Sequence, residues 1–240
     1  MPWARLCPGH PRAAAALSRS PPAPPVSVLY LDPYFLGDPL FMAGFARDLA
    51  ARPSGLVVVH GSGERGERAL EALGRFPRRA GGVWEAEDAE GRAAVERAAR
   101  ELNREIAHEL NEAGVPSVRA LGADRGLLKE SEGLGVGRAE WLGDLVGQGV
   151  TAVVASLVDG PDGLAEADPA RAAAALALGL GLPLVALTTR SLADGEPDPL
   201  GAVPDADAVR RAAETGAAVG LTPRGGLRSP ETPTVTYTGR

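Results

Sequence analysis

A glycine-rich turn after a short apolar run is the strongest chemical signal in the sequence. Residues 57–60 read Val-Val-Val-His and lead into Gly61, Ser62 and Gly63, after which a helical pattern begins. Glycines let backbone N–H groups approach an anion closely, and a helix N-terminus adds about half a positive charge. We therefore expect Gly61, Ser62 and Gly63 to hold phosphate or carboxylate oxygens.

The same turn has a second interpretation. With Gly66 it satisfies the Gly-x-Gly-x-x-Gly pattern of dinucleotide-binding proteins. In that alternative the chain is a Rossmann-type oxidoreductase that uses Gly61, Gly63 and Gly66, with Glu85 or Glu87 on a ribose. The alternative is weakened because the turn follows the second expected strand, whereas a Rossmann fingerprint follows the first. The glycines could also form only a tight strand–helix turn.

Asp168 is a further candidate, because it stands directly before Pro169 and an Ala-rich helical pattern. Asp before Pro is a common helix start, so this carboxylate is either an N-cap or a catalytic group. The three histidines lie far apart in the sequence and the chain has one cysteine, so we expect no metal site. We expect His60 to fix the glycine turn rather than to act as a base.

The charge balance limits the partners. The 240 residues carry 25 Lys and Arg against 31 Asp and Glu, and the net charge of −6 argues against a nucleic-acid partner. Lys129 is the single lysine, so arginine supplies nearly all the positive charge. No apolar run reaches the roughly 18–20 residues of a membrane helix, and no secretory signal is recognisable. We therefore expect a cytoplasmic protein without a membrane partner.

Strands and helices must alternate to position these residues. Strand-type apolar runs occur at 26–31, 56–60, 115–121, 150–157, 182–188, 217–221 and 234–238. Helical patterns occur at 38–52, 64–74, 89–113, 139–147, 169–180 and 205–215. This alternation predicts an α/β fold, a three-layer αβα sandwich with a mostly parallel sheet. Residues 1–25, rich in Pro and Ala, are expected to be a disordered tail before a single domain over 26–240.

Several segments, in collinear order, resemble the amino acid kinase family, and N-acetylglutamate kinase in particular. They are 57–63, 102–116, 120–128, 134–137, 149–155, 166–173 and 184–188. The resemblance implies the amino-acid-kinase fold and transfer of a phosphoryl group from ATP, with Mg²⁺, to the carboxylate of an acyl amino acid, as in arginine biosynthesis. It also implies substrate or phosphoryl binding at Gly61–Gly63, a catalytic role for Asp168, and nucleotide binding at Thr188 and Arg190.

The two lysines that the family uses are missing. Tyr30 stands at the first lysine position, and Asp32 and Pro33 replace the glycines beside it. Asp205 stands at the second lysine position. Loss of one well-placed charge stabiliser costs on the order of 10²–10³ in rate. We therefore expect a weak or inactive phosphotransferase, that is, a binding or regulatory homologue.

Further departures affect the substrate side. Leu164 and Glu166 replace the asparagines of the family's Asn-x-Asn-Ala-Asp motif, and the substrate arginine falls near Val83, although Arg78 or Arg79 could reach in. A working kinase would need a relocated cation, for which the two candidates are Arg190 and Arg224.

The resemblance also implies dimerisation, through the long helix expected over 89–113. The chain would form a homodimer or pair with an intact kinase paralogue. Along this helix Glu and Arg recur at i,i+4 spacing, which predicts a solvated face of ion pairs. The residues are Arg97, Arg100, Glu101, Arg104, Glu105, Glu109 and Glu112.

Overall fold

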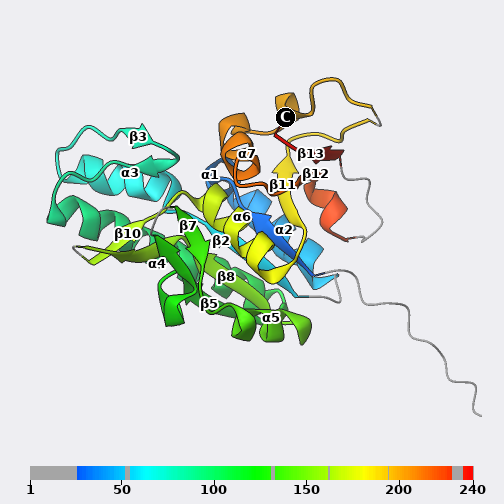
Figure 1. The fold of residues 1–240 in the computed structure, drawn as a ribbon, viewed down its shortest axis with the longest axis horizontal. Helices are drawn as coiled ribbons and strands as arrows, with labels where there is room; N and C mark the ends of the chain where they lie inside the picture. Colours follow the sequence, from blue (N-terminus) through cyan, green and yellow to red (C-terminus); the bar gives the residue numbers. More distant parts are fainter. Residues whose placement is uncertain are drawn as a thin grey trace, which may run out of the picture.

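The computed structural model describes residues 26–51, 55–130, 133–161, 163–193, 195–228 and 235–239. The predicted tail, residues 1–25, lies outside the described residues. A seven-stranded sheet forms the centre, in the order β13-β12-β11-β1-β2-β8-β5 (Figure 1). Its strands are β1 (Ser27–Tyr30), β2 (Leu56–His60), β5 (Ser117–Leu121), β8 (Thr151–Ala155), β11 (Leu184–Thr188), β12 (Val219–Pro223) and β13 (Val235–Tyr237). Only β13 is antiparallel to its neighbour.

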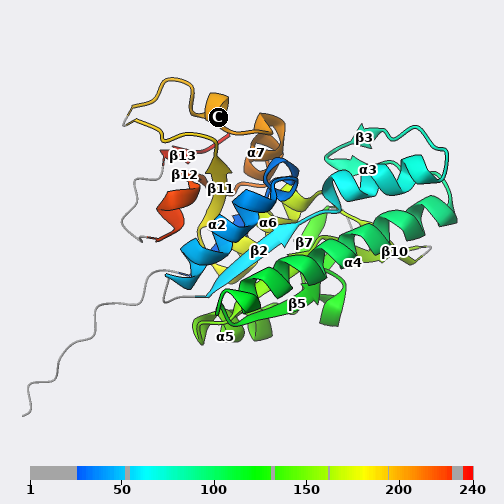
Figure 2. The same ribbon diagram turned by 180° about the vertical axis from the view of Figure 1, so that it is seen from behind.

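Helices cover both faces of the sheet, so the predicted αβα sandwich is confirmed. The helices are α1 (Pro33–Leu36), α2 (Pro39–Ala50), α3 (Gly63–Ala72), α4 (Ala89–Glu112), α5 (Glu140–Gly147), α6 (Pro169–Leu180) and α7 (Ala206–Ala213). Figure 2 shows α2 and α4 on one face, whereas α5 and α6 cover the other.

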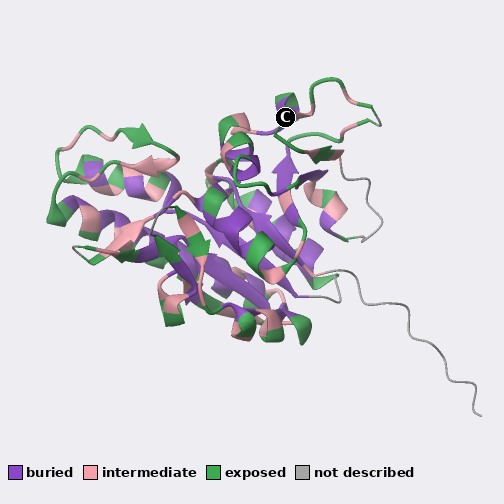
Figure 3. Cartoon of the chain, viewed as in Figure 1, coloured by how far each residue is buried: buried purple, intermediate pink, exposed green. Residues whose placement is uncertain are grey.

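The central strands are buried throughout because both faces are covered (Figure 3). Side chains alternate between the faces along β2. Val57 and Val59 contact the core under α5, α6 and α7, while Val58 contacts the core under α2 and α4. This two-sided burial explains the continuous apolar runs in the sequence.

Three small hairpins lie outside the sheet. They are β3 (Arg79–Ala80) with β4 (Val83–Trp84), β6 (Leu128–Glu130) with β7 (Leu134–Val136), and β9 (Leu157–Gly160) with β10 (Gly163–Glu166). The strand expected over 150–157 therefore divides. It leaves the sheet after Ala155, where the Ser156 backbone N–H donates to the carbonyl oxygen of His60 at 2.9 Å. The hairpin that follows ends at Glu166, and two residues, Ala167 and Asp168, separate it from α6.

Candidate functional site

The carboxyl end of β1 carries a phenol and a carboxylate where the family resemblance places a lysine. The Tyr30 hydroxyl donates to Asp32 Oδ2 at 3.4 Å, and both residues are buried. Asp32 also caps α1, because its Oδ1 accepts from the Tyr34 backbone N–H at 2.8 Å. Burial raises the pKa of Asp32, and burial together with nearby carboxylates raises the pKa of Tyr30 well above its usual value. This position therefore offers no cation to a phosphate.

His60, at the end of β2, forms a hydrogen bond that fixes the glycine turn. The amide nitrogen of Asn103 can only donate, so His60 Nε2 accepts from it at 3.1 Å. His60 Nδ1 then carries the proton and donates to the Gly61 carbonyl oxygen at 2.8 Å. Complete burial lowers the pKa of His60 to about 4. His60 thus orients the turn as a neutral ring, in the role expected from the sequence.

The carboxylate of Glu166 lies against the glycine turn. Ser62 donates its backbone N–H to Glu166 Oε1 and its hydroxyl to Oε2, the latter at 2.9 Å. A side chain at Gly61 would place Cβ 2.6 Å from Glu166 Oε1. A larger residue at this position would therefore have to displace this carboxylate. Glu166, a group of the chain itself, therefore takes the Ser62 donors, and anion binding at Gly61–Gly63 stays a prediction.

The β3–β4 hairpin covers the turn. Trp84 donates its indole N–H to the Gly63 carbonyl oxygen at 2.8 Å, and the Arg79 guanidinium lies 5.2 Å from the centre of the Trp84 ring. Desolvation raises the pKa of Glu166, and the Ser62 hydrogen bonds and the positive charge of Arg79 oppose this effect. Of the arginines expected near the substrate position, Arg79 therefore reaches the site.

Gly66 is needed for packing, which the third glycine of a dinucleotide fingerprint would also be, so the strand order decides between the two. A Cβ at Gly66 would lie 2.8 Å from Trp84 Cδ1. The strand order is also not that of a Rossmann domain: numbering the sheet strands by position in the chain gives 7-6-5-1-2-4-3, against 3-2-1-4-5-6. The Rossmann-type alternative is therefore wrong about the fold, and Glu85 and Glu87 are exposed.

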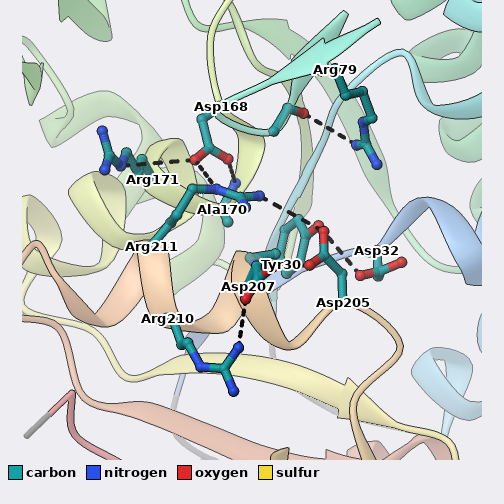
Figure 4. Close-up of polar contacts among 12 residues, drawn as sticks. Tyr30, Asp32, Arg79, Asp168, Ala170, Arg171, Asp205, Asp207, Arg210 and Arg211 are labelled. Carbon is teal, nitrogen blue, oxygen red and sulfur yellow. Dashed lines mark hydrogen bonds and ion pairs between the residues drawn. The ribbon is translucent and has the colours of Figure 1, made fainter.

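Asp168 both caps a helix and pairs with an arginine, as Figure 4 shows. It caps α6, since Oδ1 accepts from the Ala170 N–H at 3.0 Å, and it accepts from Arg211 Nε at 2.8 Å through Oδ2. Arg211 also lies 3.8 Å from Asp205, the residue at the second lysine position. A cation is therefore present, but two carboxylates neutralise it.

Arg211 is the site residue that the sequence analysis missed. Arg190 pairs with Glu196 at 3.0 Å and Arg224 with Asp48 at 3.0 Å, whereas Arg211 is the arginine that pairs with Asp168 at 2.8 Å. One signal could have found it. Long helical side chains lean toward the helix N-terminus, and Arg211 lies on α7, which Asp205 begins as N-cap.

The predicted nucleotide loop forms local contacts. The Thr188 hydroxyl donates to the carbonyl oxygen of Arg190 at 2.6 Å. Lys129 is exposed on β6. Thr188 and Arg190 remain predictions as nucleotide ligands.

Tyr30, the glycine turn and Asp168 converge at the carboxyl ends of β1 and β2, as the resemblance requires. Both Asp168 and Asp205 are close enough to raise the pKa of Tyr30, and Gly61 lies beside Pro169. A cavity of about 550 Å³ opens beside them. Its charged lining residues are Asp32, Glu64, Glu67, Arg79, Asp205, Asp207 and Arg210.

This lining does not fit Mg-ATP. Tyr30 and Asp205 stand at the two lysine positions, and the five carboxylates of the lining outnumber its two arginines, so the cavity disfavours a polyphosphate. Pro33 also removes one backbone N–H from the place where glycines would approach the phosphates. Within the described part of the chain, no group of three His, Cys, Asp or Glu side chains is placed to hold a metal ion.

Comparisons with solved structures identify the architecture. N-acetylglutamate synthase from Neisseria gonorrhoeae, solved with coenzyme A and N-acetyl-glutamate, superposes with a TM-score of 0.62 and 19% identity, over 84% of this chain and 55% of the synthase. Isopentenyl phosphate kinase superposes with a TM-score of 0.61 and 17% identity, over 85% of this chain and 94% of that kinase. The fold is that of the amino acid kinases.

The likeness concerns the fold alone, because identity is below 20%. A Streptococcus mutans protein matches similarly, with a TM-score of 0.57, 15% identity, and coverage of 82% of this chain and 94% of its own. The chain spans about half the length of the synthase. The sequence matches no protein-family model and no curated protein. No helix among the described residues is long and apolar enough to cross a membrane.

Proposed function

We propose that this chain is a non-catalytic homologue of the acetylglutamate-kinase type, which binds a small anion or acyl amino acid instead of phosphorylating it. The observation that carries the proposal is the Glu166 carboxylate on Ser62. An incoming carboxylate or phosphate would need the same N–H and hydroxyl. Ligand binding at the turn therefore requires Glu166 to move away.

The charges around the turn support the absence of phosphoryl transfer. Catalysis of this kind works by positioning and by neutralising charge on the transferring phosphoryl group. Each lost stabiliser costs about 3–4 kcal/mol of transition-state energy. Here Tyr30 with Asp32, and Asp205, stand at two such positions. Arg211 pairs with Asp168 and lies 3.8 Å from Asp205. These two carboxylates offset its positive charge, so it would stabilise a phosphoryl group only weakly.

The test is an assay for ADP release with Mg-ATP and N-acetylglutamate. We expect no ADP above the rate without protein. A thermal-shift titration with N-acetylglutamate should then raise the Tm of the wild type slightly. The rise should be clearly larger for Glu166→Asn, which removes the negative charge from the turn. Glu87→Asn, an exposed glutamate on the loop before α4, is the matched control and should behave as the wild type.

Two outcomes would contradict the proposal. ADP release that disappears in Asp168→Asn would identify a working kinase. Equal ligand shifts for wild type and Glu166→Asn would mean that Glu166 does not compete for the turn.

A second candidate function is a working kinase that uses Arg211, because a guanidinium does lie beside Asp168. In that case Arg211→Ala should abolish ADP release, while Arg47→Ala, an exposed arginine on α2 outside this cavity, should not. Pairing as a homodimer, or with an intact kinase paralogue through α4, stays a prediction that sedimentation velocity can test.

A further inference from the structure

A second concave site lies between α4 and β5, the edge strand of the sheet. It has a volume of about 450 Å³, within the range of small-molecule pockets. Its lining residues are Arg97, Arg100, Glu101, Asn103, Arg104, Arg119, Ala120, Leu121 and Asp124. Four of them are arginines, in a protein whose net charge is −6.

The two elements bring these arginines together. On α4, Arg97, Arg100 and Arg104 are three and four residues apart and share one face of the helix. Arg119 approaches from β5. The helix is held against the strand, because the Ser117 hydroxyl donates to the Ala107 carbonyl oxygen at 2.9 Å.

Most of these cations lack an anionic partner. The expected ladder of i,i+4 ion pairs forms only in part: Arg100 pairs with Glu96 at 2.8 Å. Arg97, Arg104 and Arg119 form no ion pair with any residue that the structure describes. Of the two acidic lining residues, Asp124 is already engaged, since its Oδ2 accepts from the Leu121 N–H at 2.8 Å.

The floor of this pocket is polar and firmly held. Asn103 is 2% exposed, and its amide nitrogen donates to the Val153 carbonyl oxygen at 2.9 Å and to His60. Because His60 also holds Gly61, the floor is linked by hydrogen bonds to the glycine turn.

The edge of β5 is not open to an added peptide strand. The Ser117 N–H donates to the Asn111 side chain at 3.1 Å, and the Leu121 N–H is taken by Asp124. Blocked N–H groups disfavour strand addition. A compact ligand held by side chains fits this surface better.

We propose that the α4–β5 pocket binds a small polyvalent anion, a phosphorylated or polycarboxylate metabolite. Guanidinium groups match both carboxylate and phosphate oxygens with paired hydrogen bonds. Arg97, Arg104 and Arg119 supply the charge, and Asn103 forms the floor. The site is separate from the glycine turn and does not depend on anion binding there.

Isothermal titration calorimetry at constant ionic strength tests the proposal with pyrophosphate and citrate as probes. We expect saturable 1:1 binding of at least one probe. Binding of pyrophosphate alone indicates a phosphoryl ligand, and binding of citrate alone a polycarboxylate. Arg104→Ala should weaken binding about tenfold, the effect of losing one charge-assisted contact. The triple variant with alanine at 97, 104 and 119 should abolish it.

Arg47→Ala removes an exposed helix arginine on α2 and is the control for net charge. Circular dichroism melting of the ligand-free variants checks that each is folded. The proposal is overturned if neither probe binds, if the triple variant binds like the wild type, or if Arg47→Ala loses as much affinity as Arg104→Ala. Binding that survives the triple variant but disappears in Ser62→Ala would place the anion at the glycine turn and overturn it as well.

Discussion

Glu166 accepts two hydrogen bonds from Ser62, one from the backbone N–H and one from the hydroxyl, across 104 residues of sequence. The chain thus places its own carboxylate where the glycine turn would hold a ligand's. This single contact joins the β9–β10 hairpin to the start of α3. It leaves the turn predicted to bind an anion in contact with a carboxylate of the chain itself.

Glu166 should make the protein less stable as the pH rises. Its pKa in the folded state is raised by desolvation, so the folded state holds the proton to higher pH than the unfolded state. Stability is then greatest below the ordinary pKa of 4.5 and is lost as the pH rises through the raised value. Urea unfolding across this range should show the decline, and Glu166→Gln should remove it. A decline of the same size in Glu166→Gln would contradict the assignment.

His60 should make the protein less stable as the pH falls. Its pKa is lowered from 6.5 to about 4, so the unfolded state binds the proton first as the pH falls. The stability present at pH 7 is therefore lost between about 6.5 and 4, by on the order of 3 kcal/mol. The measurement is the difference in unfolding free energy between wild type and His60→Gln over that range. A difference that does not change with pH would contradict a buried neutral ring.

Gly61→Ala should destabilise the protein by about 1–3 kcal/mol, because the new Cβ would crowd Glu166 Oε1 at 2.6 Å and Pro169 Cγ at 3.2 Å. The cost should fall when Glu166→Ala is added, since one of the two crowded groups is then gone. Urea denaturation of the double-mutant cycle measures this coupling. Gly147→Ala, at a helical glycine with open space around it, is the control and should cost little. Strict additivity would show that Glu166 does not restrict Gly61.

Arg211→Ala should cost about 1–3 kcal/mol of unfolding free energy, because it removes the ion pair at 2.8 Å and leaves the 8%-exposed Asp168 side chain with only the longer pair to Arg171 at 3.9 Å. Arg210→Ala is a matched control from the same helix. Arg210 pairs with Asp207, but both side chains are more than half exposed, so its loss should cost less than about 0.5 kcal/mol. Equal costs for the two variants would show that the Asp168 pair adds nothing.

The sequence alone determined the layered sheet, the glycine turn between β2 and α3, and the start of α6. These features follow from local patterns: apolar runs bounded by turns, glycines before a helix, and Asp168 before Pro169. Strand β2 and helix α6 have the bounds that those patterns predict. The substitutions at Tyr30 and Asp205 were also visible, since they depend only on residue type.

Only the tertiary structure decided what fills the turn and where the remaining cation lies. In the sequence, Glu166 was a replaced asparagine and Arg211 one of many arginines. Their partners Ser62 and Asp168 lie 104 and 43 residues away, and no local pattern specifies such distances. The packing of the β9–β10 hairpin and of α7 against the strand ends determines where these long side chains point. That packing converts a turn predicted to bind a ligand into one that binds the chain itself.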